Sequence, residues 1–314
     1  MSGGEFDWIA RLLRPLTKGA PEALDLLDDA AVLPSRPGYD LVMTKDAMVA
    51  GVHFLPDDPL DLVARKLLRV NLSDLAAKGA EPWGYLLATA WPHDTSWDAK
   101  ALFARGLAVD GETFGLTLLG GDTVSTPGPL TLTATLLGWV PQGGAVLRRG
   151  ARPGDLLAVS GTIGDGFLGL KAATGELDSA VLADRYRLPR PRLDLIEGIR
   201  AHARAAADVS DGLLADAGHI AWASACGARI DLDRLPLSGE AEAWVDGQPD
   251  RVAALAALAT GGDDYQVVCA LPVVGGKPAD MTVIGFFFEG EGLSVRHDNK
   301  PVSVGKLGWD HSRT

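Results

Sequence analysis

Aspartates that stand among small residues at the edges of apolar runs constrain this chain more than any other feature of its sequence. They lie in six segments, residues 26–33, 42–46, 70–77, 118–123, 207–212 and 260–265. A carboxylate beside a buried strand is costly unless a cation pairs with it, and most of these segments contain no Lys or Arg. The pattern predicts a fold whose strand ends and loops converge on metal, with Mg²⁺ favoured because it takes carboxylate and phosphate oxygens. For any one segment, a helix cap or a turn is the alternative interpretation.

The composition limits the class of protein. A chain of 314 residues with 47% hydrophobic and 22% charged residues is expected to form one large or two ordinary soluble domains. The formal charge of −12 disfavours nucleic acid and anionic membranes as partners. The first residues are acidic where a signal peptide needs basic ones, and no apolar run approaches the roughly 20 residues that span a bilayer. We therefore expect a cytoplasmic protein in which Cys226 and Cys269 are buried free thiols.

Hydrophobic periodicity predicts mixed helices and strands in both halves of the chain. Apolar residues recur at helical spacing from Leu60 to Leu67, which predicts a helix that continues to Gly79 and carries Asp74 near its C-terminal end. A strand at 40–44 is expected to deliver Asp46 at its end, and a strand at 116–119 to end at residues 120–122. Further helices are expected at 5–14, 97–114, 164–174, 192–204, 212–226 and 250–259, and further strands at 83–90, 130–140, 156–160, 205–209, 228–232, 264–271 and 282–288.

Clusters of glycine and proline at residues 141–144 and 150–154 predict a domain boundary between them. We place the first domain at residues 1–145 and the second at residues 146–314, each an α+β or α/β mixture. Residues 235–249 are expected to form a surface connection.

A glycine pattern at residues 164–169 has the form GxGxxG after a strand and before a helix, which is typical of a dinucleotide site. No apolar strand ending in an acid follows the helix, so a tight turn and a helix N-terminus are the favoured interpretation. The sequence also contains no P-loop motif, no zinc-ligand spacing and no GxSxG elbow.

Taken in order, the acidic segments and their neighbours resemble the thiamine-monophosphate kinase family. The matching motifs are Gly4-Glu-Phe6, Asp28-Asp-Ala-Ala-Val32, Val49-Ala-Gly-Val-His-Phe54, residues 70–77, Gly120-Gly-Asp-Thr123, residues 149–155, residues 208–213, Gly261-Gly-Asp-Asp-Tyr265 and Gly308-Trp-Asp310. Each motif alone is weak, but the ordered series covers nearly the whole chain and is specific. The resemblance implies the two-domain fold of the aminoimidazole ribonucleotide synthetase superfamily. It also implies a homodimer with a barrel-like sheet at its interface, an N-terminal domain that binds ATP and magnesium, and an active site in the cleft between the domains.

The resemblance further implies direct in-line transfer of the γ-phosphoryl group of ATP to thiamine monophosphate, with several Mg²⁺ ions and no covalent intermediate. Metal ligands would be Asp29, Thr44, Asp46, Asp74, Asp122, Asp208 and Asp211, with Asp74, Asp122 and Asp211 closest to the chemistry. Gly121, Asp122, Arg148 and Ser210 would bind ATP, with Arg149 as the alternative to Arg148. His53, Asp263 and Trp309 would bind thiamine phosphate. Structural roles remain alternatives for Thr44, His53, Asp74 and Trp309.

Three departures from the family pattern bear on these assignments. Asp25-Leu-Leu27 replaces family glycines, so the loop cannot take positive φ angles cheaply. Lys45 replaces a hydroxyl residue, and its ammonium group could replace a cation or pair with Asp46. Asp263 and Gln266 replace two glutamates. The alternatives are therefore a non-catalytic relative that binds nucleotide or thiamine phosphate, and a kinase or synthetase of the same superfamily with another acceptor.

Overall fold

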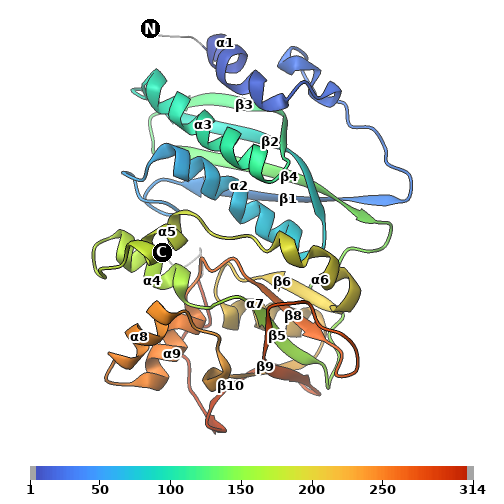
Figure 1. Ribbon diagram of the computed structural model, residues 1–314, viewed down its shortest axis with the longest axis vertical. Coiled ribbons are helices and arrows are strands. Elements are labelled where there is room, and N and C mark those ends of the chain that lie inside the picture. The colour runs from blue at the N-terminus through green and yellow to red at the C-terminus, as the bar shows by residue number, and fades with distance from the viewer. Residues whose placement is uncertain (1–4, 310–314) are drawn as a thin grey trace. The chain divides into compact units, whose positions relative to one another are not determined.

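The structure, a computed structural model, describes residues 5–309, which form two compact units (Figure 1). The first unit comprises the chain up to residue 75 together with residues 80–143, and the second comprises residues 76–79 and the chain from residue 144 onward. The sequence placed this division after residue 145. Gly4 and Asp310, which belong to two of the family motifs, lie outside the described residues.

The first unit combines a four-stranded sheet with helices. Its elements are α1 (Glu5–Trp8), the π-helix η1 (Ile9–Leu13), the 3₁₀-helices η2 (Arg14–Thr17) and η3 (Pro21–Leu26), β1 (Tyr39–Val49), α2 (Leu60–Ala77, whose last residues belong to the second unit), β2 (Glu81–Pro92), α3 (Trp97–Thr113), β3 (Thr117–Thr126) and β4 (Thr131–Pro141). The strand order is β1-β4-β2-β3, so β1 and β3 are the edges, and β3 runs parallel to β2. Helices α2 and α3 lie over one face (Figure 1).

Alternation along the strands sorts the side chains of this sheet into a covered and an open face. Thr44, Asp46 and Met48 of β1 share the covered face, where Thr44 contacts Asp74 of α2. The intervening residues Leu41, Met43, Lys45 and Ala47 are exposed, as are Leu86 and Ala88 of β2. The sheet is therefore packed on one side only within the described chain.

The second unit is built on a seven-stranded sheet of order β11-β10-β7-β9-β5-β8-β6. Its elements are β5 (Leu156–Ser160), α4 (Asp165–Ala173), α5 (Ala180–Arg187), η4 (Leu193–Leu195), α6 (Ile196–His202), β6 (Ala205–Asp208), α7 (Leu213–Ala223), β7 (Gly227–Asp231), η5 (Leu232–Arg234), α8 (Gly239–Asp246), α9 (Arg251–Thr260), β8 (Val267–Leu271), β9 (Met281–Phe288), β10 (Leu293–His297) and β11 (Lys300–Pro301).

Both faces of this second sheet are buried, and each face has its own apolar core. Leu157 and Val159 of β5 join the core that includes α7 and α9, whereas Ala158 joins a smaller core with Ile199 of α6. Strands buried on both faces read as continuous apolar runs, which is why β5 and β8 were predictable from the sequence. Cys226 belongs to the first core and Cys269 to the second, and both are buried free thiols as predicted.

Several predicted elements differ from the structure in ways that matter for the site. Strands β1 and β3 run past Asp46 and Asp122, because the neighbouring strands continue to pair with them at Ala134 and Ala88. Residues 235–249, expected to be a surface connection, contain α8, whose N-terminus is capped by the Ser238 hydroxyl. In the part of the chain that the structure describes, no helix is long and apolar enough to cross a membrane.

Candidate functional site: two acidic constellations

A pair of carboxylates from a strand and a helix forms the acidic constellation of the first unit. Asp46 projects from the covered face of β1 and Asp74 from α2, and Thr44 Oγ1 donates a hydrogen bond of 2.5 Å to Asp74 Oδ2. Burial, and then the charge of Asp74, raises the pKa of Asp46 to about 7. Without a cation the two carboxylates therefore resist being ionised together. Three hard oxygen donors in this arrangement fit Mg²⁺.

His53 lies in a loop that follows β1 and is held at two points. Its Nδ1 accepts the N–H of Val49 at 3.1 Å, and its carbonyl oxygen accepts a hydrogen bond from Lys66 Nζ at 3.0 Å. Because Nδ1 is an acceptor, the neutral imidazole carries its proton on Nε2. Lys66 is itself only 2% exposed, so a buried side chain of α2 anchors the loop. The half-buried ring therefore has its hydrogen-bond donor at Nε2.

Asp122 and Gly121 lie on the opposite edge of the sheet from Asp46. In the strand register, Asp46 aligns through Ala134 and Leu87 with Gly121, three strand spacings or about 14 Å away. Asp122, one residue further, lies on the open face and is exposed. A single copy of the chain therefore does not bring Asp122 to Asp46 and Asp74.

Gly121 has a structural reason to be glycine in addition to its predicted role. A Cβ at this position would lie 1.8 Å from the Leu87 carbonyl oxygen, because β2 and β3 approach closely here. The sequence interpretation, in which the missing side chain lets ATP approach the backbone, is not required to explain the residue.

The loop that carries Asp29 adopts the positive φ angles for which it has no glycines. Leu24, Asp25 and Leu26 have φ of 48°, 57° and 55°. For residues with a Cβ this conformation costs about 1–2 kcal/mol each, so the loop is strained. Asp29 is exposed at its end, and its backbone N–H donates to Asp28 Oδ1.

Lys45 lies between Thr44 and Asp46 in β1, so its exposed side chain is on the other face of the strand. Within the described residues, the ion pair between Lys45 and Asp46 that the sequence left open is therefore not formed. Lys45 instead shares the open face of the sheet with Asp122.

The acidic constellation of the second unit surrounds the loop between β6 and α7. Asp208 ends β6 and is 4% exposed, and Ser210 and Asp211 follow in the loop. The loop is organised by Asp216 of α7, whose Oδ2 accepts the backbone N–H groups of Ser210, Asp211 and Gly212 at 3.1, 3.2 and 3.2 Å. Burial, and then Asp211, raises the pKa of Asp216 to about 7. Three donors converging on one oxygen fix the conformation of the loop.

Arg148 lies close to this loop. Its positive charge counteracts part of the rise in the pKa of Asp216. Its side chain is exposed, and its carbonyl oxygen accepts a hydrogen bond from the Ser224 hydroxyl. The charge of Arg148 thus acts on the carboxyl group that organises the loop of Ser210 and Asp211.

Asp263 is joined to the same loop through the backbone. Its N–H donates to the Ser210 carbonyl oxygen at 2.9 Å, and its Oδ1 accepts a hydrogen bond from the Tyr265 hydroxyl at 2.9 Å. Asp263 and Tyr265 both have positive φ, 68° and 49°, so the segment is strained. The Asp263 side chain is thereby held in a fixed orientation.

The glycine pattern at residues 164–169 holds a carboxylate of the protein itself. The N–H groups of Gly164 and Gly166 donate to Asp264 at 2.8 and 2.9 Å, at the start of α4. Burial raises the pKa of Asp264 to about 8, although these two hydrogen bonds oppose the rise. The interpretation as a turn and a helix N-terminus is confirmed, because an internal side chain takes the donors that a phosphate would need.

Trp309 reaches the loop from the C-terminal part of the described chain. Its backbone N–H donates to the Asp211 carbonyl oxygen at 2.8 Å, the residue is 49% exposed, and Lys306 Nζ lies 5.1 Å from the ring centroid. A Cβ on Gly308 would lie 2.7 Å from the same carbonyl oxygen. A tryptophan exposed to this extent favours a stacking surface over a plug in a core groove.

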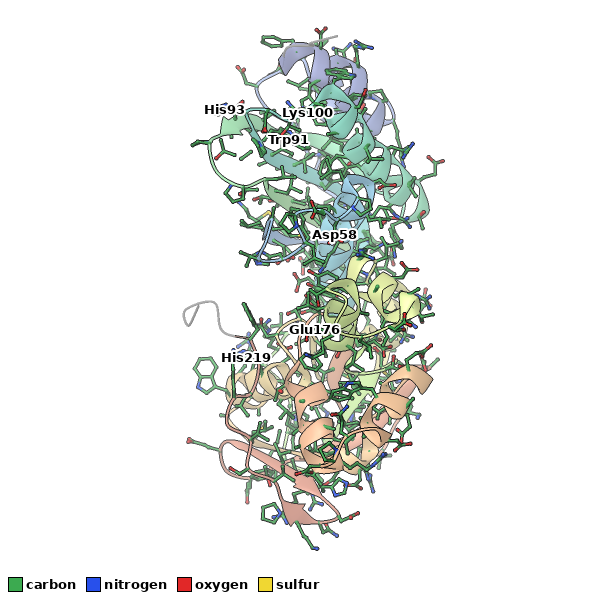
Figure 2. The ribbon with its side chains drawn as sticks, turned by 90° about the vertical axis from the view of Figure 1, so that its left-hand side faces the viewer. Asp58, Trp91, His93, Lys100, Glu176 and His219 are labelled. Carbon is green, nitrogen blue, oxygen red and sulfur yellow. The ribbon has the colours of Figure 1, made fainter. Side chains whose placement is uncertain are left out.

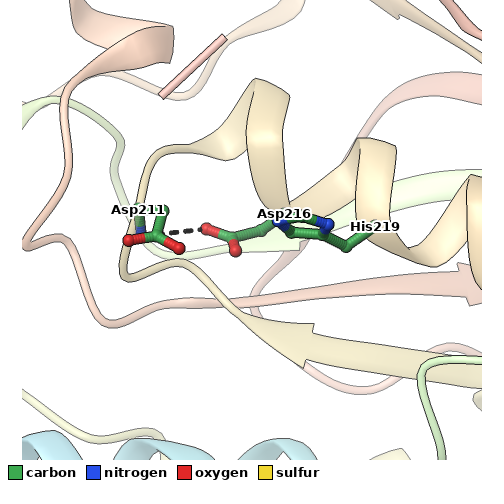
Figure 3. A group of neighbouring side chains, drawn as sticks. All are labelled: Asp211, Asp216 and His219. Carbon is green, nitrogen blue, oxygen red and sulfur yellow. Dashed lines mark hydrogen bonds between the residues drawn. The ribbon is translucent and has the colours of Figure 1, made fainter. Parts of the chain in front are cut away.

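Asp216, His219 and Asp264 did not stand out in the sequence as site residues. Asp211, Asp216 and His219 each offer one ligand atom within 4.8 Å of the others (Figure 3). Their spacing holds a signal, since Asp216 and His219 are three residues apart on one helix and share a face.

A cavity of about 560 Å³ is lined by residues 33–41 with Trp139 and Gln142. None of the predicted site residues lines it. We therefore keep the acidic constellations as the candidate site, because they carry the groups that can bind cations and phosphates.

The family model for AIR synthase related proteins matches both halves of the chain. Its N-terminal domain matches residues 27–140 and its C-terminal domain matches residues 152–267.

Individual relatives match this chain over nearly its whole length. The chain is 61% identical to a thiamine-monophosphate kinase of Caulobacter vibrioides over 319 residues, covering 98% of this chain and 90% of the relative. The crystal structure of thiamine-monophosphate kinase from Stenotrophomonas maltophilia K279a has a TM-score of 0.81 and 36% identity, covering 96% of this chain and 99% of that one. A structure described as AaThiL complexed with AMPPCP and TMP has a TM-score of 0.80 and 32% identity, covering 98% of this chain and 97% of that one.

Proposed function

Because the chain belongs to the thiamine-monophosphate kinase family, we propose that it transfers the γ-phosphoryl group of ATP to thiamine monophosphate with several Mg²⁺ ions. The products are thiamine diphosphate and ADP. A relative of the same fold holds AMPPCP, an ATP analogue, together with TMP. The observation that carries the magnesium part of the proposal is the group of Thr44, Asp46 and Asp74, in which burial and the charge of Asp74 raise the pKa of Asp46, so that a bound cation would favour the ionised pair.

The carboxylates would hold the cations at positions that their elements fix. In the first unit Thr44, Asp46 and Asp74 form one group of hard oxygen donors, and Asp29 lies in the strained loop. In the second unit Asp208 and Asp211 flank Ser210. Mg²⁺ bound there would offset the repulsion between two anionic substrates and stabilise charge in the transition state.

The remaining residues would bind and orient the two substrates. His53 donates from Nε2 to the acceptor phosphate, because its Nδ1 is already an acceptor. Arg148 and the Ser210 hydroxyl serve ATP phosphates. Asp263, fixed by Tyr265, and Trp309 accommodate the cationic thiamine, whose thiazolium suits an aromatic face. The acceptor oxygen is itself ionised near neutral pH, so transfer is direct and no side-chain nucleophile is needed.

We also propose a homodimer formed through the open face of the first unit's sheet. Leu41, Met43 and Val124 are 41%, 67% and 50% exposed on or beside its edge strands. An apolar patch exposed on one face of a sheet is typical of a protein–protein contact surface. A second copy packed by two-fold symmetry can bring Asp122 on the β3 edge of one copy to the β1 edge of the other. Met43→Glu should then yield monomers by sedimentation velocity and lower activity together with assembly.

The decisive assay is ATP-dependent conversion of thiamine monophosphate, with the product identified by chromatography. Asp74→Asn should lower the rate on the order of 10²-fold or more, because the variant loses a charge that acts in the transition state. The matched control is Asp61→Asn in the first turn of the same helix, where the ion pair with Arg105 is long and exposed.

Ligand binding without turnover at saturating magnesium would favour a non-catalytic relative. Turnover of a different phosphate in an acceptor panel would favour another kinase of the superfamily. An Asp74→Asn variant as active as the parent protein would contradict the proposed cation site.

A further inference from the structure

We propose that Asp211, Asp216 and His219 form a binding site for a divalent first-row transition cation with an imidazole nitrogen as one ligand. One ligand atom from each side chain lies within 4.8 Å of the others. Figure 3 shows the Asp216 carboxyl group facing Asp211, with the His219 ring on the same helix. Ligands of one cation, each about 2.0–2.3 Å from it, lie within such a span. The proposed site shares Asp211 with the magnesium ligands of the proposed function, and it goes beyond that function through Asp216 and His219, to which no role in phosphoryl transfer is assigned.

A buried oxygen without a partner supplies independent support. Asp216 is 1% exposed, and its Oδ2 takes all three backbone N–H groups of the loop. Its Oδ1 is fully buried and has no hydrogen-bond partner among the described residues. An unpaired buried carboxylate oxygen is costly. A cation beside Oδ1 would remove this cost.

His219 supplies the ligand that sets the chemistry of the site. It lies three residues after Asp216, so both side chains share one face of α7. The imidazole is exposed, and it makes no hydrogen bond or ion pair with residues 5–309. Either ring nitrogen is therefore available to a metal, and rotation of an exposed side chain can adjust the distance.

The ligand set distinguishes this site from the all-oxygen groups assigned to Mg²⁺. Two carboxylates and one imidazole favour Mn²⁺, Co²⁺ or Zn²⁺ over Mg²⁺, which prefers oxygen alone. The two carboxylates also provide the charge that a divalent cation needs. The competing way to neutralise the pair is a proton held by Asp216, and the experiment below separates the two.

The test uses the full-length protein, freed of metal with EDTA and then saturated with Mn²⁺ in the absence of ATP and thiamine monophosphate. Unbound Mn²⁺ is removed by gel filtration, and pulsed electron paramagnetic resonance detects ¹⁴N coupled to bound Mn²⁺. We expect a nitrogen modulation in the parent protein that is lost in His219→Ala. Titration calorimetry should show that this site weakens about tenfold or more in the variant.

The matched control is His93→Ala, since His93 is also exposed and lies beside an acid, Asp94, in the first unit (Figure 2). It should retain the nitrogen modulation. Absence of the modulation in the parent protein, or its persistence in His219→Ala, would overturn the proposal and leave a proton on Asp216 as the explanation. Because no substrate is present, this result is independent of whether the kinase assay succeeds.

Discussion

Replacing Asp264 with asparagine should change how the stability of the protein depends on pH. The Asp264 side chain is 6% exposed and accepts N–H groups from Gly164 and Gly166. Burial raises its pKa to about 8 in the folded state, whereas an unfolded aspartate has a pKa of about 3.9. The folded protein therefore holds a proton on Asp264 that the unfolded chain releases.

The sign follows from this difference. Because the folded state binds more protons, the contribution is fully present below about pH 4 and is lost as pH rises toward about pH 8. Each pH unit inside that window lowers the free energy of unfolding by about 1.4 kcal/mol. The parent protein should therefore lose about 3 kcal/mol of this free energy between pH 5 and pH 7 through Asp264. Asp264→Asn is neutral at every pH and should lack that loss. Relative to the parent protein, the free energy of unfolding of the variant should therefore rise by about 3 kcal/mol from pH 5 to pH 7.

The assay is urea unfolding of both proteins at pH 5, 6 and 7 with EDTA present, so that cations do not contribute. Asp57→Asn, at an exposed loop position, controls for the removal of one negative charge. Any constant cost of fitting an amide at position 264 lowers the free energy of unfolding of the variant by the same amount at each pH. Parallel stability profiles for the parent protein and Asp264→Asn would refute the reasoning.

Three further substitutions test the packing and strain around the site, each by urea unfolding. Gly121→Ala should destabilise the protein by about 1–3 kcal/mol, because its Cβ would meet the Leu87 carbonyl oxygen. Leu24→Gly should stabilise it by about 0.5–1 kcal/mol, because the relief of a positive φ outweighs the added freedom of the unfolded chain. Asp110→Asn should cost about 3–5 kcal/mol, because this fully buried carboxylate pairs with Arg65 and Arg69.

Each of these substitutions has a matched control elsewhere in the chain. A Cβ on Gly239, at the exposed start of α8, meets nothing within 4 Å, so Gly239→Ala should be neutral or slightly stabilising. Leu33 is as exposed as Leu24, 37% against 38%, and has no positive φ, so Leu33→Gly should destabilise. Asp61→Asn breaks only an exposed ion pair and should cost less than about 1 kcal/mol. Equal effects within any of the three pairs would contradict the explanation given for that pair.

The sequence predicted the elements whose pattern repeats locally. Helix α2 followed from its apolar spacing, and β5 from a short apolar run between turns. The ends of β1 and β3 were not predictable, because they depend on where neighbouring strands stop pairing. Helix α8 was missed, since a short helix in a polar segment depends on its Ser238 cap and on burial of Val245 against the core.

For the acids of the candidate site, too, only part of their role could be predicted from the sequence. Their positions at strand ends and loops indicated cation binding, but the sequence could not show which acids meet. Asp46 meets Asp74 because β1 packs against α2, whereas Asp122 is on the other face because of a register that only the folded sheet sets. Asp216 and Asp264 read as ordinary acids, since their importance comes from backbone N–H groups that converge on them.

The placement of the two cysteines has a practical consequence. Since Cys226 and Cys269 lie in separate apolar cores on opposite faces of one sheet, a thiol reagent can reach each of them only after a different part of the second unit opens. The rates at which the two thiols are labelled under native conditions therefore report local opening separately for each face of the sheet. Substituting either cysteine by serine would allow the labelling rate of the remaining thiol to be measured alone.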